Sequence, residues 1–314
     1  MSVLLAVSGG IDSMYLANRA PELFSGEEFS IAHCNFRLRG EESEGDEAFV
    51  RSWCEDRKIR LHVAHFDTAG VAQERGISIE MAARELRYDW FASLCEQFGY
   101  RGVAVAHNAN DNAETLILNL LRGTGSRGVR GMAAESCRDS GLVILRPMLD
   151  IDRKSIESWM RDKGCKWRED SSNGENAYKR NIIRNEVFPI FERINPGFLQ
   201  TLNSDMRRLA QADDIADSYF RAALSKVTDI RGIVIDRLLE LEHWEPVLWR
   251  LLEELSLSEQ TFGKLTALLR KYKNYPRGTV TVGGKVFQSP LGQAVIKGGR
   301  ISIHKESEQA SSEP

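Results

Sequence analysis

The residues Ser8-Gly-Gly-Ile-Asp-Ser13 carry the first chemistry that the sequence suggests. They follow an unbroken apolar run, residues 3–7, and they precede a stretch with helical character. An apolar run without alternation is typical of a buried parallel strand. Glycines let a ligand approach the backbone closely, and the unpaired N–H groups at a helix start attract phosphate. We therefore predict a phosphate-binding strand–loop–helix, with Asp12 able to hold Mg²⁺ on that phosphate.

This string differs from a Walker A loop because it contains no Lys. Ser8 and Ser13 add two hydroxyl donors to it. Taken alone, the string is also compatible with an ordinary turn built from small residues. It resembles the PP-loop of the ATP pyrophosphatases, which cleave ATP between its α and β phosphates and pass AMP to an acceptor. NAD synthetases, GMP synthetases and several tRNA-modifying enzymes share that loop.

The composition limits the class of protein. A chain of 314 residues with 42% hydrophobic and 28% charged residues predicts a soluble globular protein of about two domains. No apolar run is long enough to span a bilayer, and we expect no signal peptide. The net charge of −3 argues against a globally basic nucleic-acid binder. Any contact with nucleic acid would have to come from local basic patches.

The cysteines indicate the compartment. There are five, an odd number, and none forms a C-x-x-C pair. This spacing argues against a disulfide framework, a zinc ribbon and an Fe–S cluster, and it favours the reducing cytoplasm. It also argues against the tRNA-thiolating PP-loop enzymes that depend on such a pair.

Strand-like and helical segments alternate through the first half of the chain. After the first strand, strand-like runs occupy residues 30–34, 61–65, 103–106 and 142–145, and helical patterns occupy 46–57, 79–98 and 111–122. This alternation predicts βαβ units and a parallel sheet, so the fold class is α/β. Ligands of such sheets bind at the carboxyl ends of the strands. The ends at Ser8, at His33–Asn35 and at His107-Asn108 are therefore expected to face one cleft.

Several arginines lie close to these strand ends. Arg37 and Arg39 follow the second strand, and Arg84 and Arg87 lie on one helix beside Glu80. They could point towards an anionic substrate. The alternatives are a solvated loop for the first pair and a surface ion-pair row for the second.

A second informative stretch follows the fourth strand. Asp111 and Glu114 are three residues apart on a first helical turn, where two carboxylates could hold Mg²⁺ or could simply complement the helix N-terminus. The segment 122–131 then carries four glycines, no acid, and the basic residues Arg122, Arg127 and Arg130. A flexible cationic loop of this kind suits a phosphate backbone.

Together these blocks resemble the tRNA(Ile)-lysidine synthetase family, a branch of the PP-loop ATP pyrophosphatases. The matching blocks occur in the family's order over roughly residues 2–205, which chance matches do not explain. They are Ser8–Ser13, His33–Gly40, Ala83–Tyr88, Ala106–Thr115, Leu120–Gly123, Arg146–Pro147, Glu169–Asn173 and Arg180–Arg184.

The resemblance implies an activity. The family ligates free L-lysine to the wobble cytidine of tRNA(Ile) with a CAU anticodon, through an adenylated cytidine, and releases pyrophosphate and AMP. ATP and Mg²⁺ are the implied cofactors. The implied partners are the tRNA and lysine, with no membrane, and a homodimer is left open.

The resemblance also implies roles for individual residues. It places catalysis on Asp12, Asp111, Arg122 and Arg39, and Mg²⁺ on Asp12 and Asp111. The residues implied to bind ATP are Ser8, Gly9, Gly10, Ile11, Asp12, Ser13, His33 and His107. The residues implied to bind tRNA are Arg84, Arg87, Arg127, Arg130, Arg180 and Arg184.

The chain departs from the family pattern at five positions. Phe36 and Asn108 replace histidines, Asn110 and Asn112 replace an Asp and a Gln, and Ser171 replaces a Pro. Asp111 therefore becomes the better candidate for the carboxylate of its motif.

The expected organisation has four parts. Residues 1–195 form a PP-loop catalytic domain (adenine nucleotide alpha hydrolase-like), 196–224 a long connector helix, 225–305 a small tRNA-contacting domain and 306–314 a disordered tail. In the small domain, the pattern of residues 230–275 is helical. Short strands follow from Gly278, with turns at 283–284 and 298–299.

Two rival functions remain compatible with the sequence. One is a PP-loop ligase acting on a small molecule, such as an NAD or GMP synthetase, which would need an ammonia source. The other is a non-catalytic RNA-binding protein on a decayed ligase fold. The intact loop at residues 8–13 argues against decay.

Overall fold

The computed structural model describes residues 1–169, 175–274 and 284–305, with the backbone alone over 175–178. The chain divides into two compact units, Met1–Ala210 and Gln211–Pro314. Three predicted features lie outside the described residues: the tail at 306–314, the strand start at 278 with the turn residue Gly283, and the part of the family block that includes Ser171 and Asn173.

The first unit is built on a six-stranded sheet with the order β3-β2-β1-β4-β6-β5. The four pairings among β3, β2, β1, β4 and β6 are parallel, which confirms the predicted α/β fold class. β5 pairs antiparallel with β6, and no sequence pattern predicts it. The strands are β1 (Ser2–Ala6), β2 (Glu28–Asn35), β3 (Leu61–His65), β4 (Val103–Ala104), β5 (Glu135–Cys137) and β6 (Val143–Leu145).

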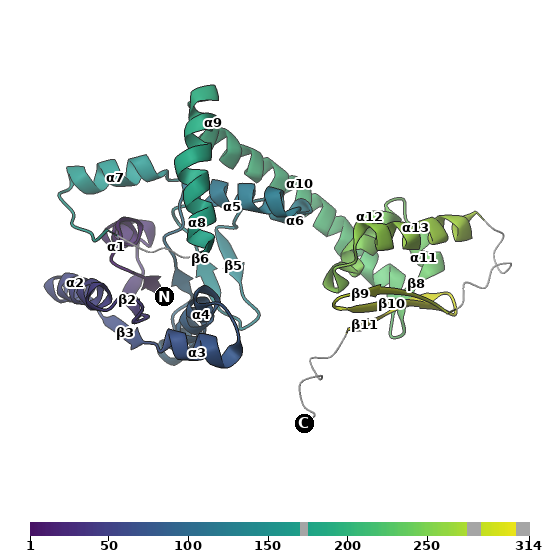
Figure 1. Cartoon of the computed structure of the whole chain (residues 1–314), viewed down its shortest axis with the longest axis horizontal. Coiled ribbons are helices and arrows are strands. Elements are labelled where there is room, and N and C mark those ends of the chain that lie inside the picture. The colour runs from purple at the N-terminus through teal and green to yellow at the C-terminus, as the bar shows by residue number, and fades with distance from the viewer. Residues whose placement is uncertain (170–174, 275–283, 306–314) are drawn as a thin grey trace. The chain divides into compact units, whose positions relative to one another are not determined.

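Helices connect these strands and cover the sheet (Figure 1). The helix over 79–98 has the predicted bounds, with Ser78 capping its first turn. The other two predicted helices begin earlier than expected. The helices are α1 (Ile11–Leu23), α2 (Glu41–Arg57), α3 (Thr68–Arg75), α4 (Ile79–Phe98), α5 (Ala109–Arg122), α6 (Ser126–Val129), α7 (Arg153–Asp162), α8 (Glu175–Ile182), η1 (Ile183–Val187, a π-helix) and α9 (Phe188–Ile194).

β1 lies at the centre of two apolar cores. Val3 and Leu5 pack in the core that includes Met14 of α1 and Met160 of α7. Leu4, which points to the opposite face of the strand, packs in the core that includes Phe91 of α4. A strand buried on both faces explains the apolar run without alternation. It also fixes the residues that follow β1 at a defined point on the sheet edge.

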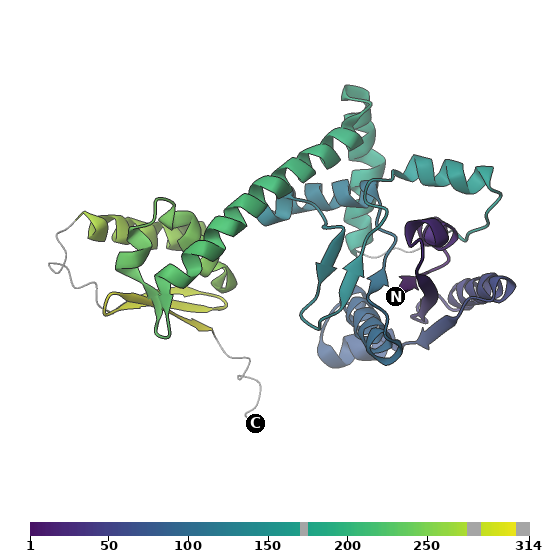
Figure 2. The same ribbon diagram turned by 180° about the vertical axis from the view of Figure 1, so that it is seen from behind.

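The helix α10 (Phe198–Val227) is continuous across the boundary between the two units. The second unit contains a five-stranded sheet, in the order β7-β8-β11-β10-β9, and a helical layer, which Figure 2 shows from behind. Its elements are β7 (Thr228–Asp229), β8 (Gly232–Val234), α11 (Ile235–Leu239), α12 (Trp244–Leu251), η2 (Glu253–Leu255), α13 (Glu259–Lys273), β9 (Lys285–Ser289), β10 (Gly292–Lys297) and β11 (Arg300–Lys305).

The secondary structure of the second unit differs from the prediction at its start. Residues 232–234 were expected to be helical, but they form β8, because Ile233 is buried and pairs with Ile301 of β11. The predicted turn at Gly298-Gly299 joins β10 to β11, and both glycines have a positive φ, 57° and 73°. Among the described residues, no helix combines the length and the apolar character needed to cross a bilayer.

Candidate active site

The loop that follows β1 is shaped by its own serine. The Ser13 Oγ accepts hydrogen bonds from the backbone N–H groups of Ser8 (3.2 Å) and Gly9 (3.1 Å) and donates to the carbonyl of Gly10 (2.8 Å). Gly9 has a φ of +100°, a conformation that other residues rarely adopt. In this arrangement the Ser13 hydroxyl holds the loop closed around the start of α1.

A distant segment lies across the same loop. Arg168 forms an isolated parallel bridge with Gly10, and its N–H donates to the carbonyl of Gly9 at 2.9 Å. The Arg168 guanidinium binds the carboxylate of Asp46 on α2, which also accepts from Arg39 at 2.9 Å. Because Asp46 is buried, this charge cluster fixes the segment 167–169 against the loop.

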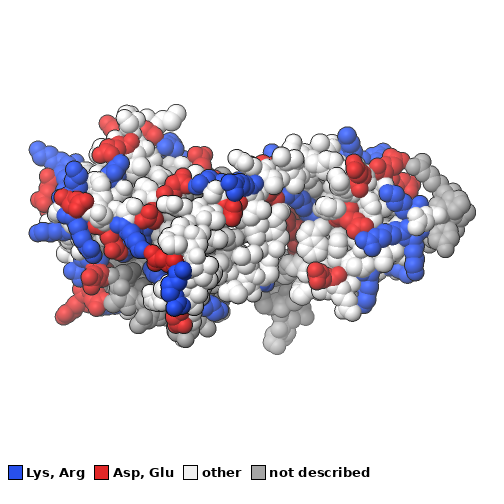
Figure 3. Space-filling model, turned by 90° about the horizontal axis from the view of Figure 1, so that it is seen from above, with Lys and Arg blue, Asp and Glu red and all other residues white. Residues whose placement is uncertain are grey.

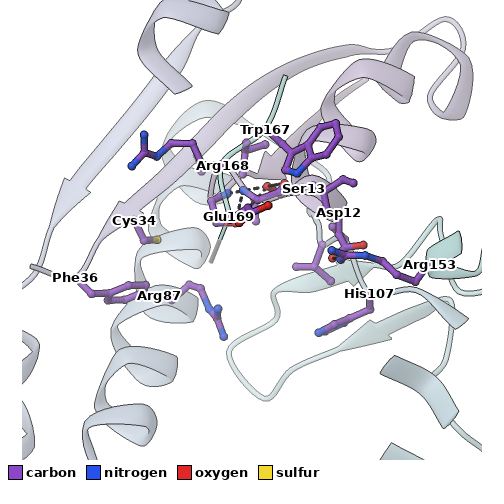
Figure 4. Close-up of a pocket in the computed structure, with 18 of the residues that line it drawn as sticks. Asp12, Ser13, Cys34, Phe36, Arg87, His107, Arg153, Trp167, Arg168 and Glu169 are labelled. Carbon is purple, nitrogen blue, oxygen red and sulfur yellow. Dashed lines mark hydrogen bonds and ion pairs between the residues drawn. The ribbon is translucent and has the colours of Figure 1, made fainter. Parts of the chain in front are cut away.

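The loop opens into a cavity of about 650 Å³. Its walls come from the ends of β1, β2 and β4, from one face of α7, from α4 and from the segment 167–169 (Figure 4). A volume of this size is typical of small-molecule sites. Three predicted strand ends therefore do meet at one cavity, as expected for a parallel sheet.

The cavity contains about half of the predicted site residues. Those that line it are Ser8, Gly10, Ile11, Asp12, Ser13, Arg87, His107 and Arg184. Those that do not line it are Gly9, His33, Arg39, Arg84, Asp111, Arg122, Arg127, Arg130 and Arg180.

Asp12, a carboxylate of the cavity wall, is held by two partners. Its Oδ1 accepts from the side chain of Asn108 at 3.1 Å, and its Oδ2 forms an ion pair with Arg153. Burial raises the pKa of Asp12 above its ordinary value, against the lowering effect of Arg153, and the charge of Asp111 adds to the rise. The sequence analysis did not single out Arg153. It placed Asn108 at a strand end facing the cleft, but it did not predict the bond from Asn108 to Asp12.

Asp111 lies on the first turn of α5, and Glu114 follows it on the next turn. Asp111 accepts from the backbone N–H of Asn108 at 3.0 Å, which completes a capping box with Asn108. Arg184 approaches Glu114 at 2.7 Å and Asp111 at 3.5 Å. Glu114 is fully buried, and burial raises its pKa although Arg184 opposes the rise. Asp111 therefore caps the helix, as one interpretation expected, and the Mg²⁺ role of the two carboxylates remains a prediction.

The carboxylates allow a test of fit for Mg²⁺. Over the described ranges, no cluster of three or more His, Cys, Asp or Glu side chains could hold a metal ion. Mg²⁺ usually binds through one or two carboxylates together with substrate phosphates and water. Asp12, with Asp111 close enough to influence its pKa, fits a cation that arrives with a nucleotide. Such a cation and the Arg153 guanidinium would both bind the Asp12 carboxylate.

His107 faces the cavity among arginines. Burial is the main cause, and the charges of Arg146, Arg180, Arg87 and Arg84 add to it; together they lower the pKa of His107 to about 3. The ring is therefore neutral at physiological pH. Its Nδ1 is buried and has no hydrogen-bond partner among the residues that the structure describes.

Several other predicted residues have local partners. The ring of His33 is buried, with Nδ1 2.9 Å from the carbonyl of Val7. Arg122 donates to the carbonyl of Leu118 and to Asn119 on its own helix. Their predicted roles in catalysis and ATP binding remain predictions.

The basic loop after α5 is held near the end of that helix, because Asn119 donates to the carbonyl of Gly128 at 2.8 Å. On the face shown in Figure 3, basic and acidic side chains are mixed over both units. This mixture agrees with the small net charge of the chain. An anion that binds on this face would therefore contact a local group of arginines, because the face as a whole is not basic.

Comparison with known proteins identifies the fold and the family. A family model described as the PP-loop domain matches residues 1–191. A tRNA(Ile)-lysidine synthase of Porphyromonas gingivalis strain W83 is 46% identical over 220 residues, which are 70% of this chain and 46% of that protein. The enzyme of Parabacteroides distasonis is 40% identical over 271 residues, which cover 86% of this chain and 60% of the relative.

The match to a third relative covers more of that relative's length. The tRNA(Ile)-lysidine synthase of Chlorobaculum tepidum is 38% identical over 230 residues, and the match covers 73% of this chain and 67% of that protein. The chain nevertheless spans only about half the length of the first relatives, between 43% and 60% of each.

A solved structure supports the architecture alone. The U34-tRNA thiolase NcsA of Methanococcus maripaludis superposes with a TM-score of 0.54 at 18% identity, over 67% of this chain and 72% of that one. The family model, the relatives and the loop geometry agree. The chain belongs to the PP-loop family and, within it, to the tRNA(Ile)-lysidine synthase family.

Proposed function

We propose that this protein ligates L-lysine to the wobble cytidine of the tRNA(Ile) that carries a CAU anticodon, with ATP as the activating substrate. The observation that carries the proposal is the composition of one cavity. Its walls combine the PP-loop with Arg87, His107 and Arg184, which come from three separate family blocks. A phosphate site and a cationic wall thus share one space, as a transfer from ATP to a nucleic acid requires.

The first half of the reaction is activation. The C2 carbon of cytosine is a poor electrophile until its oxygen is adenylated. ATP on Ser8–Ser13 would present its α-phosphate to that oxygen, with the backbone N–H groups at the start of α1 directed at phosphate. Asp12 and Asp111 would hold Mg²⁺, and this ion would neutralise negative charge on the departing pyrophosphate. Arg39 and Arg122 remain proposed partners for phosphate charge.

The second half is the attack of the lysine ε-amine on C2, which expels AMP. The cytosine must first leave its stack, and an anticodon loop allows this at low cost. His107 is neutral, so it can offer a hydrogen bond and not a charge. Arg87 and Arg184 line the cavity, and Arg84 and Arg180 are near enough for their charges to act on His107. These four arginines are the proposed contacts for the anticodon phosphates.

The basic loop at 122–131 and the second unit are proposed to bind the rest of the tRNA. The end of α13 carries three basic residues, Arg270, Lys271 and Lys273. The cytoplasm is the proposed location, because the five cysteines are free thiols in the structure.

A labelling experiment tests the function. The protein is incubated with ATP, Mg²⁺, labelled lysine and tRNA(Ile) bearing a wobble C, and label in the RNA is measured. We expect label that depends on ATP and on the C, with tRNA(Met) as the matched control RNA. Incorporation of labelled ammonia, or label on a small nucleotide, would instead support a small-molecule ligase.

Substitution of Asp12 tests the activation step. Asp12→Asn keeps an acceptor for Asn108 and removes the charge, so we expect pyrophosphate release to fall by at least about 100-fold, the order of effect of removing one electrostatic group. Asp150→Asn is the control, since Asp150 is exposed, pairs with Arg207 and does not line the cavity. Near wild-type turnover by a folded Asp12→Asn protein would contradict the role of this carboxylate.

The basic loop is tested by salt dependence. Replacing Arg122, Arg127 and Arg130 together by Ala should weaken tRNA binding. The slope of log Kd against log salt concentration should also fall, by about 0.7–0.9 for each phosphate that the variant no longer neutralises. The measurement is filter binding or anisotropy at several salt concentrations, with Arg208→Ala as the control. An unchanged affinity and slope would mean that this loop is simply solvated.

A further inference from the structure

The pairing of two strands fixes the position of His107. β4 lies parallel to β1, with Ala104 opposite Leu5. His107 and Ser8 each follow three residues later, so the histidine leaves the sheet edge beside the first residue of the PP-loop. Figure 4 shows the ring of His107 pointing from its strand end into the cavity, whose lining includes both residues. A group that reacts at the PP-loop would therefore come close to this ring.

One atom of the His107 ring lacks a partner. Its Nδ1 is buried, and none of the residues that the structure describes forms a hydrogen bond with it. The charges that act on the ring come from the guanidinium groups of Arg146, Arg180, Arg87 and Arg84. Guanidinium groups can only donate hydrogen bonds, so these surroundings favour an Nδ1 that accepts. Because a buried polar atom without a partner is unfavourable, Nδ1 is an open position for a group on a ligand.

Arg146, whose charge acts most strongly on His107, is held by other partners. Its Nη1 donates to the carbonyl of Ala133 and to the hydroxyl of Ser136, both at 2.9 Å. Arg146 therefore acts on the histidine through its charge and does not take up the open position at Nδ1.

The charge around His107 limits the kind of group that can fill this position. The surrounding arginines repel an ammonium group, so neither amine of the lysine substrate suits it. A phosphate would bind the guanidinium groups instead, because hydrogen bonds between charged groups are the stronger ones. A neutral N–H donor meets neither objection. The exocyclic amine of a nucleobase is such a donor, and cytosine carries one at C4.

We propose that Nδ1 of His107 accepts a hydrogen bond from the exocyclic amine of the wobble cytosine and so selects this base for adenylation. The inference rests on the proposed function, which puts the cytosine oxygen at the α-phosphate of ATP. A base that reacts there touches the PP-loop directly, whereas the ribose separates the adenine of ATP from the α-phosphate. His107, beside Ser8, is therefore better placed for the reacting base than for adenine. Its role changes from ATP binding, which the family resemblance implied, to recognition of the target base.

The test removes the amine from the RNA and the acceptor from the protein in turn. Transcripts of tRNA(Ile) carry cytosine or pyrimidin-2-one, which lacks the amine, at the wobble position, and kcat/KM for pyrophosphate release is measured with the whole protein. The preference for cytosine should be about tenfold greater in the wild type than in His107→Leu, the effect of one hydrogen bond. Comparing this preference between proteins cancels the intrinsic difference in reactivity of the two bases.

His107→Gln is the second variant, because its side chain again offers an acceptor. Its preference for cytosine should stay within about threefold of the wild type, which is well short of the tenfold effect of one hydrogen bond. This variant keeps the test decisive if the His107→Leu protein does not fold. An equal preference in the wild type and in His107→Leu, or the loss of the preference in a folded His107→Gln protein, would overturn the assignment.

Two controls separate this role from the other readings. Purine riboside triphosphate lacks the adenine amine, and if His107→Leu changes the preference for ATP over this analogue instead, the histidine binds adenine and the assignment is wrong. His65→Gln changes a histidine that pairs with Glu47 and does not line the cavity, so both preferences should stay unchanged. A wild-type protein that releases no pyrophosphate with the cytosine transcript would overturn the proposed function itself.

Discussion

The backbone conformation of the loop after β1 is the constraint on which the site depends. β1 is buried between two helical layers, so its carboxyl end cannot shift along the sheet. The loop then turns at Gly9, which has a φ of +100°, and the Ser13 hydroxyl accepts hydrogen bonds from the N–H groups of Ser8 and Gly9. The backbone N–H of Arg168 donates a hydrogen bond to the Gly9 carbonyl and so holds the loop from the other side. Every other wall of the cavity is placed relative to this loop.

Charge balance is the second organising feature. Burial of Asp12 is unfavourable for its ionised form, and Arg153 and Asn108 offset part of that cost. Other cavity arginines are likewise held by carboxylates from distant elements, such as Asp46 and Glu114. A polyanion entering the site competes with these carboxylates for the same guanidinium groups. A nucleotide in the site would therefore displace part of an existing charge network.

Sequence patterns predicted the elements whose signals are local. The apolar run of β1 and the capped helix over 79–98 were predictable because burial and capping leave their mark on neighbouring residues. β5 was missed because its short strand, Glu135–Cys137, has mostly exposed side chains and no apolar run. The β8 error has a similar cause, since only its pairing with neighbouring strands makes it a strand.

In the site, the loop at residues 8–13 was found from its own spacing. Arg153 was not found, and the contact of Asn108 with Asp12 was not predicted. These two partners lie 141 and 96 positions from Asp12 in the chain, and no local pattern reports such a contact.

The proposed function requires the oxygen at C2 of the wobble cytosine to attack the α-phosphate of ATP in this cavity. The most direct measurement uses tRNA(Ile) whose wobble cytidine carries ¹⁸O at that carbonyl, and mass spectrometry of the released AMP. If the cytosine oxygen is adenylated and then leaves with AMP, the ¹⁸O must appear in AMP and be absent from the lysine-modified base. Unlabelled AMP formed together with modified tRNA would contradict this chemistry.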